Sequence, residues 1–228
     1  MPREKKKLGA WFPKASVIKG ASYDPEVVKS ISLLLFYQYA EPMWSDARKV
    51  AAVARVEAAA QRLNLGGRVR VANEGLNATV SGPAEAVRGL AVDLAAFDPC
   101  FAATDWKYVD GLPLDRAFTD LKVLPVQELV FYGLGAGGGA LASGQLGSKG
   151  GVHLEPREYH AKLSAPGEDT VVVDVRNAYE SDIGRFGGQA GTGGAELLDP
   201  GMRKSTDFPT WLARPDVKKK LHGKEILM

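Results

Sequence analysis

The sequence contains little cysteine and histidine, and it has no long apolar segment. Its 228 residues include one cysteine, Cys100, and three histidines. One cysteine cannot form an internal disulfide, and no CxxC pair or histidine cluster has zinc-ligand spacing, so we expect neither a disulfide scaffold nor a metal site. The apolar runs are far shorter than the ~20 residues of a membrane span, and no signal-peptide pattern opens the chain. We therefore expect an intracellular protein with no membrane segment, metal ion or other cofactor.

Glycine is abundant, and most of it lies in two segments. Of the 26 glycines, nine fall between Gly133 and Gly151 and seven between Gly184 and Gly201. The first segment consists mainly of alanine, glycine and serine, which is typical of a flexible linker. The sequence therefore predicts two domains joined by a linker over residues 134–152.

Basic residues are concentrated at the start of the chain. The formal net charge of the whole sequence is only +2, but Lys5, Lys6 and Lys7 stand in a row near the N-terminus. We interpret residues 1–28 as a basic extension. It is either solvated or an arm that contacts phosphate groups or an anionic membrane.

Residues 29–133 alternate between strand and helix patterns. Ile31–Tyr39 is an apolar, β-rich run that predicts a buried strand, and Pro42 follows its end. One helix is expected from the N-cap candidate Asp46 to Leu63, with a left-handed stop over residues 64–67, and a second begins at Pro83. The other strands are expected at 68–72, 78–81, 104–109 and 122–132, and the first two form a hairpin in which Gly75 can take a positive φ. The β-α-β-β-α-β order indicates an α+β domain of the ferredoxin-like, or acylphosphatase-like, class, with both helices on one face of the sheet.

Residues 153–228 have the pattern of an α/β domain. The run TVVVDV, Thr170–Val175, is typical of a parallel strand that is covered on both faces. Helices are expected near 155–163, 177–182 and 208–221, the last of them interrupted by Pro215. Further strands are expected near 195–198 and 224–228. Because such domains usually contain about 100 residues or more, we expect an incomplete parallel-sheet domain whose last strand needs a protein partner to cover it.

Four segments resemble one protein family. They are VANEGLNATVSG (Val71–Gly82), DVRNAYESDIGRF (Asp174–Phe186), FPTW (Phe208–Trp211) and GKEILM (Gly223–Met228). With them, the chain resembles the rhodanese-domain tRNA uridine hydroxylases, formerly an uncharacterised family of rhodanese-like proteins. The resemblance implies a ferredoxin-like domain followed by a rhodanese-like domain. It also implies a role in the oxygen-dependent conversion of the wobble uridine of certain tRNAs to 5-hydroxyuridine.

The resemblance further implies where the nucleophile of the family lies. In the family, the strand matching Glu225–Met228 leads into a loop with a CTGG-type opening. Its first cysteine is the nucleophile, whose thiolate is stabilised by backbone N–H groups. The catalytic cysteine is therefore expected beyond Met228, and the chain as given is expected to be inactive by itself. Cys100 lies in the other domain, and we interpret it as an ordinary thiol.

The remaining candidate site residues are charged or aromatic. Asp174 and Arg176 follow the TVVVDV strand and are candidates to support an active-site loop, with a structural ion pair as the alternative. Four aromatic residues could stack on bases or pack in the core: Tyr37, Tyr39, Phe131 and Tyr132. The candidates for RNA binding are Lys5, Lys6, Lys7 and Lys122.

Two other functions are compatible with the sequence. The chain could be a non-catalytic structural or RNA-contacting subunit of a larger ribonucleoprotein assembly, such as an organellar ribosome, with tRNA or rRNA as its partner. Sulfurtransferase chemistry is the second, and it needs the same cysteine. The sequence leaves the compartment open among cytoplasm, mitochondrion and chloroplast.

Overall fold

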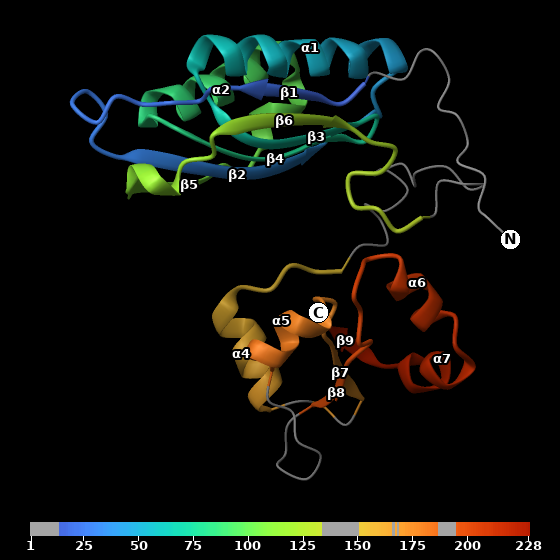
Figure 1. The fold of residues 1–228 in the computed structure, drawn as a ribbon. Helices are drawn as coiled ribbons and strands as arrows, with labels where there is room; N and C mark the ends of the chain where they lie inside the picture. The colour runs from blue at the N-terminus through green and yellow to red at the C-terminus, as the bar shows by residue number, and fades with distance from the viewer. Residues whose placement is uncertain (1–13, 134–150, 166, 168, 187–194) are drawn as a thin grey trace, which may run out of the picture. The chain divides into compact units, whose positions relative to one another are not determined.

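The computed structural model describes residues 14–133, 151–165, 167, 169–186 and 195–228. The described residues form two compact units, one up to Leu129 and one from Val130 onward. Each unit contains its own sheet (Figure 1). Three parts of the predictions lie outside the described residues: Lys5, Lys6 and Lys7, nearly all of the predicted linker, and the glycine-rich segment 187–194.

The first unit is built on a mixed six-stranded sheet with the order β1-β6-β3-β4-β2-β5. Strand β6 runs parallel to β3, and the other neighbouring strands are antiparallel. Helices α1 and α2 cover one face of this sheet (Figure 1). The elements are β1 (Ser16–Lys19), β2 (Ile31–Tyr39), α1 (Asp46–Leu63), β3 (Gly66–Ala72), β4 (Gly75–Gly82), α2 (Ala84–Phe97), the 3-10 helix η1 (Pro99–Ala103), β5 (Lys107–Leu112), the 3-10 helix η2 (Leu114–Arg116) and β6 (Asp120–Pro125).

Local signals determine the two ends of α1. Ser45 is the N-cap, and its hydroxyl accepts a bond from the Arg48 amide at 3.2 Å. The predicted N-cap, Asp46, lies instead in the first turn, where its negative charge faces the positive end of the helix dipole. Asn64 ends the helix in the left-handed conformation, as the predicted stop over residues 64–67 requires.

A tight hairpin joins β3 to β4. Ala72 is the register partner of Gly75, so only Asn73 and Glu74 form the turn. Gly75 has a φ of +133°, and a Cβ atom at this position would lie 2.0 Å from the carbonyl oxygen of Gln38. The hairpin was predicted, and β3 ends at Ala72 as expected, but β4 begins at Gly75 instead of residue 78, because this glycine allows the backbone of β2 to approach closely.

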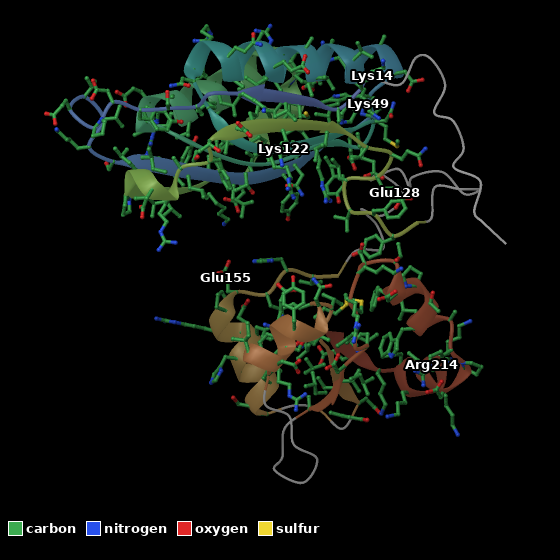
Figure 2. All side chains as sticks on the ribbon, in the orientation of Figure 1. Lys14, Lys49, Lys122, Glu128, Glu155 and Arg214 are labelled. Carbon is green, nitrogen blue, oxygen red and sulfur yellow. The ribbon has the colours of Figure 1, made fainter. Side chains whose placement is uncertain are left out.

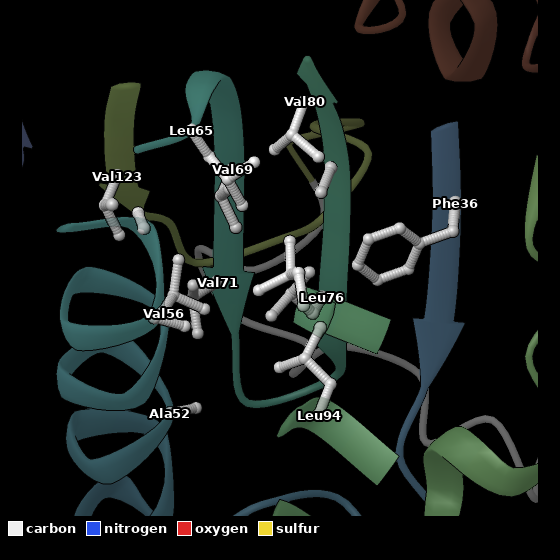
Figure 3. Packing of buried hydrophobic residues seen from close by; sticks show 14 of the residues in the cluster. Phe36, Ala52, Val56, Leu65, Val69, Val71, Leu76, Val80, Leu94 and Val123 are labelled. Atoms are coloured by element: carbon white, nitrogen blue, oxygen red, sulfur yellow. The ribbon is translucent and has the colours of Figure 1, made fainter. Parts of the chain in front are cut away.

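The hydrophobic core of the first unit lies between the sheet and the two helices (Figure 3). Alternate side chains of each inner strand point into it, since successive residues of a strand face opposite sides. Phe36 packs at 4.5 Å from Trp106 and 6.5 Å from Phe101, measured between ring centroids. Each such fully buried side chain contributes roughly 1.5–3 kcal/mol to folding.

The sheet begins earlier in the chain than predicted. Strand β1 falls inside the segment 1–28, which we had interpreted as an extension, and it pairs with β6 through Ser16 opposite Val123. Helix α1 also holds this strand, since the Ser16 hydroxyl donates to the Glu57 carboxylate. A four-residue edge strand is too short to be identified by periodicity, and its partner strand determines where it forms.

Two later strands differ from their predicted ranges. The predicted strand 104–109 is shifted to Lys107–Leu112, because Thr104 closes the short helix η1. The predicted strand 122–132 ends at Pro125, which has no N–H group for the ladder. Beyond it, the hairpin still holds the chain, since the Glu74 carboxylate accepts a bond from the Leu129 amide at 2.9 Å.

The second unit contains a parallel three-stranded sheet with the order β8-β7-β9. The side chains of β7 alternate between two apolar clusters: Val171 and Val173 face Phe208 and Trp211, whereas Val172 faces the side of α4. The prediction that this strand is covered on both faces is therefore confirmed. The elements are α4 (Pro156–Ser164), β7 (Thr170–Val173), α5 (Ala178–Ile183), β8 (Glu196–Leu198), α6 (Asp207–Leu212), α7 (Pro215–Leu221) and β9 (Glu225–Leu227).

The predicted interruption of the last helix at Pro215 is confirmed: α6 ends before it, and Pro215 occupies the first turn of α7, because it cannot continue the preceding helix. In the last strand, β9, Leu227 is buried but Ile226 is 41% exposed. Among the described residues, none of the helices has both the length and the apolar character needed to cross a bilayer.

Candidate functional site

Asp174 and Arg176 lie directly after β7, at the carboxyl end of the parallel sheet. Ligands of open α/β sheets bind outside this edge, so the two residues lie where a ligand would be expected. The Asp174 backbone N–H donates to the Leu198 carbonyl at 3.2 Å, which fixes the start of the loop against β8. Asp174 is only 2% exposed, whereas the Arg176 side chain is 41% exposed.

The carboxylate of Asp174 accepts four hydrogen bonds. Arg176 donates through its backbone N–H at 3.1 Å, through Nε at 2.9 Å and through Nη2 at 2.7 Å, and the Ser181 hydroxyl donates at 2.9 Å. The bonds from Arg176, followed by that from Ser181, lower the pKa of Asp174 to about 2 against the opposing effect of burial. The group therefore stays ionised, and it orders the turn that leads into α5.

Arg176 connects this turn to the end of α5. Its Nη2 group also donates to the Gly184 carbonyl at 2.9 Å, and its guanidinium lies 5.8 Å from the ring centre of Phe186. At the other end of the helix, Asn177 and Glu180 form a capping box, in which the Glu180 carboxylate accepts the Asn177 backbone N–H at 3.0 Å. The segment DVRNAYESDIGRF is thus held as one bonded loop and helix.

A pocket of about 170 Å³ opens beside this loop within the second unit. Its polar lining comes from Arg176, Asn177, Glu180 and Ser205, and Phe208 is among its apolar lining residues. The volume is below the roughly 300 Å³ at which pockets hold drug-sized ligands. The pocket therefore has room for a small polar group next to the Arg176 guanidinium.

The first unit presents basic and aromatic side chains on the sheet face that the helices leave open. Lys122 extends from β6 (Figure 2), and it is the register partner of Arg68 on β3. Arg70 lies on the same face two residues further along β3, and Tyr37 and Tyr39 lie there on β2. Sequence reasoning missed both arginines, although the alternation Arg68-Val69-Arg70-Val71 could have shown that they share a face.

Comparison with known proteins decides the family. Residues 31–129 match the family described as the UPF0176 acylphosphatase-like domain. The first unit is a UPF0176 domain. Proteins named tRNA uridine(34) hydroxylase are similar over a longer range: that of Rhodococcus erythropolis is 36% identical over 68% of this chain, and that of Bacillus pumilus is 32% identical over 87%.

A plant protein is also similar to this chain. The Rhodanese-like domain-containing protein 6 of Arabidopsis thaliana is 32% identical over 86% of the chain. The chain spans 51% of the Rhodococcus relative, 54% of the Bacillus relative and 33% of the Arabidopsis relative, so it covers about half or less of these proteins. The resemblance deduced from the four sequence segments is confirmed: the chain is homologous to the tRNA uridine(34) hydroxylases.

Cys100 lies in the UPF0176 domain, far along the chain from the loop after β7. It sits in η1, where its backbone N–H donates to the Asp98 side chain at 3.0 Å. Burial, followed by its contact with the Asp98 carboxylate, raises the pKa of this thiol to about 12. The thiol is therefore protonated at neutral pH and is a poor nucleophile.

Among the residues that the structure describes, no group of three His, Cys, Asp or Glu side chains is placed to hold a metal ion. The chemistry that the described arrangement can provide is electrostatic. It consists of a guanidinium beside a small pocket in one unit and a basic, aromatic surface in the other.

Proposed function

We propose that this chain takes part in the hydroxylation of a uridine in tRNA, the reaction that the names of its relatives describe. The observation that carries the proposal is the extent of the similarity, because the Bacillus protein named tRNA uridine(34) hydroxylase matches 87% of the chain. A match of this extent includes residues of both units, and not only the UPF0176 domain.

Within this function, the two units have different roles. The first unit, with its split β-α-β arrangement of β2, α1 and β3 around β4, is a ferredoxin-like domain that binds the RNA. The second unit is a rhodanese-like domain, in which Asp174 and Arg176 support the reacting loop. The four hydrogen bonds to Asp174 and the pocket beside Arg176 support this role.

The 228 residues supply binding and support, and they do not supply the nucleophile of this reaction. The only cysteine of the chain is Cys100, and its raised pKa of about 12 leaves almost no thiolate at neutral pH. Purified alone, the chain therefore binds tRNA without modifying it.

The test compares tRNA nucleosides from cells that carry the gene for this protein with those from cells that lack it. We expect 5-hydroxyuridine to decrease on deletion and to recover when the gene is restored, as measured by mass spectrometry of digested tRNA. An unchanged amount of 5-hydroxyuridine contradicts the proposed function. A second experiment incubates the purified chain with tRNA and oxygen. Formation of 5-hydroxyuridine in this experiment contradicts the proposal that the chain lacks the nucleophile of the reaction.

The alternative is a non-catalytic, RNA-contacting subunit of a ribonucleoprotein assembly such as an organellar ribosome. The protonated Cys100 thiol favours it, and so do the exposed apolar side chains of Ile226 and Met228, which a protein partner could cover. Sedimentation of a native extract separates the two functions. The alternative predicts that the protein co-sediments with a large RNA particle at physiological salt, whereas the tRNA modification function predicts that it does not.

A further inference from the structure

The exposed side of the six-stranded sheet has features of a nucleic-acid surface that no relative's name specifies. We define the open sheet face as the exposed and half-buried side chains of β2, β3, β4 and β6 that point away from α1 and α2. Neighbouring residues of the same strands, such as Phe36, Val69 and Val123, point into the core on the other side. The alternation of the strands therefore assigns Leu35 and Asp120 to the open sheet face, together with the side chains that the proposal uses: Arg68, Arg70, Lys122, Asn77, Thr79, Tyr37 and Tyr39.

The register arranges these side chains in two rows that run across the sheet. In the first row, Lys122 lies opposite Arg68, and Arg68 lies opposite Thr79. In the second, Arg70 lies opposite Asn77, and Asn77 lies opposite Tyr37. Strands are about 4.8 Å apart, and like-facing residues of one strand are about 6.6 Å apart. The basic side chains therefore form one cluster at the β3–β6 side, and the tyrosines lie two strands away.

Among the described residues, no carboxylate forms an ion pair with the basic cluster. In the described part of the chain, Arg68 and Lys122 form no ion pair, and Arg70 donates at 3.3 Å to the Leu129 carbonyl, which is uncharged. On β6, Asp120 lies two residues before Lys122, and its register partner on β1 is Lys19. Like charges on facing positions destabilise a sheet, so this cluster costs stability unless an anion neutralises it.

The tyrosines are exposed in spite of their apolar rings. Tyr37 is 67% exposed and Tyr39 is 38% exposed, with ring centroids 6.1 Å apart and planes at 72°. Packing of these rings in the core, the alternative that the sequence left open, is therefore wrong, because the core side of β2 is occupied by Leu34 and Phe36. Exposed aromatic faces next to a basic cluster are what single-stranded nucleic acids use, through base stacking and phosphate contacts.

We infer that the open sheet face binds a single-stranded segment of RNA, such as a tRNA loop. Arg68, Arg70 and Lys122 contact the phosphates, and Tyr37 and Tyr39 stack on bases. Asn77 and Thr79 lie between the two groups, where their side chains can bond to ribose hydroxyls or base edges. A paired helix does not fit as well, because its bases are not free to stack on the rings. The identity of the RNA as tRNA rests on the proposed function, whereas the inference that single-stranded RNA binds to this face does not.

The test measures binding of the purified chain to three probes by fluorescence anisotropy. The probes are an unstructured oligoribonucleotide, a fully paired RNA duplex and phosphatidylserine vesicles. We expect the unstructured RNA to bind most tightly. In the double variant Arg68→Glu and Lys122→Glu, the slope of log Kd against log salt decreases by about 1.4, since each phosphate contact to a single strand contributes about 0.7. Arg55→Glu, which reverses one charge on the exposed side of α1, retains the slope.

Substitutions of Tyr37 separate stacking from charge. Tyr37→Ala weakens binding of the unstructured RNA about tenfold, and Tyr37→Phe retains the affinity because the ring remains. Equal binding by the double variant and the wild type overturns the inference, as does an unchanged affinity of Tyr37→Ala. Tighter binding to the duplex or to the vesicles than to the unstructured RNA also overturns it.

The inference and the proposed function fail in different ways. If tRNA binds the wild type and the charge-reversed variant equally, RNA does not bind at the open sheet face, but the proposed function is not contradicted. If the variants lose RNA binding while deletion of the gene leaves the amount of 5-hydroxyuridine unchanged, RNA does bind at the open sheet face, and the proposed function is wrong.

Discussion

The carboxylate of Asp174 is enclosed, yet it remains charged because four donors bind it. Its pKa is about 2 in the folded chain, compared with an ordinary value of 3.8. Since the folded state binds the proton more weakly than the unfolded state, ionised Asp174 stabilises the fold in full above about pH 4. This contribution is lost as the pH decreases toward 2.

Asp174→Asn removes the charge and should destabilise the second unit by about 2 kcal/mol at neutral pH. The substitution should also weaken the dependence of stability on pH between 4 and 2. Hydrogen exchange of the β7 amides measures both effects, because these amides report the opening of the second unit. Asp216→Asn is the control, since its ion pair with Arg214 is exposed, and equal effects of the two substitutions contradict the prediction.

At the scale of secondary structure, Asp98 joins the start of α1 to the end of α2. Its carboxylate accepts bonds from Trp44 Nε1 at 3.1 Å, from Arg48 Nε at 3.1 Å and from the Cys100 amide at 3.0 Å. Two helices that cover the same sheet face are thereby held together at one end. The residue also begins η1, which places Phe101 in the core.

Asp98→Ala should lower the free energy of unfolding of the first unit by about 2 kcal/mol, because it leaves the partly buried donors of Trp44 and Arg48 without an acceptor. Denaturant titration followed by tryptophan fluorescence measures this loss. Asp93→Ala, which breaks the more exposed ion pair with Arg62, should change the stability by about 0.5 kcal/mol or less. A loss for Asp93→Ala as large as that for Asp98→Ala contradicts this assignment.

At the scale of the whole molecule, each unit contains its own hydrophobic core. The large core cluster draws all its residues from the first unit, and the two smaller clusters draw theirs from the second. A fragment of residues 14–129 should therefore fold by itself. We expect a single cooperative thermal transition and a dispersed amide spectrum in NMR. A fragment that contains helix but shows no cooperative transition contradicts the independence of this core.

The elements that the sequence predicted well have a long pattern or a specific end signal. β2 was predicted to the residue, because nine consecutive residues favour a strand. The left-handed stop at Asn64 and the positive φ of Gly75 were also predicted. β1 was missed because a short edge strand forms only where a partner strand is available. The end of β6 was missed because Pro125 interrupts backbone pairing, and the sequence does not show which strand β6 pairs with.

For the candidate sites, the sequence located residues but not their surroundings. It placed Asp174 and Arg176 after a parallel strand, but the four donors and the pocket depend on α5 and on the segment around Ser205. It selected Lys122 and left Arg68 and Arg70 aside. Their proximity depends on β6 pairing with β3 across fifty residues of chain, which no local pattern encodes.

By itself, the sequence indicated two domains, most of the strands and helices in each and the family of the chain, because these depend on local periodicity, turn residues and recognisable sequence segments. Only the tertiary structure decided which strands are neighbours, which sheet face remains open and how exposed each ring and charge is. These properties come from contacts between residues far apart in the chain, and such contacts form only when the sheet and its helices pack together.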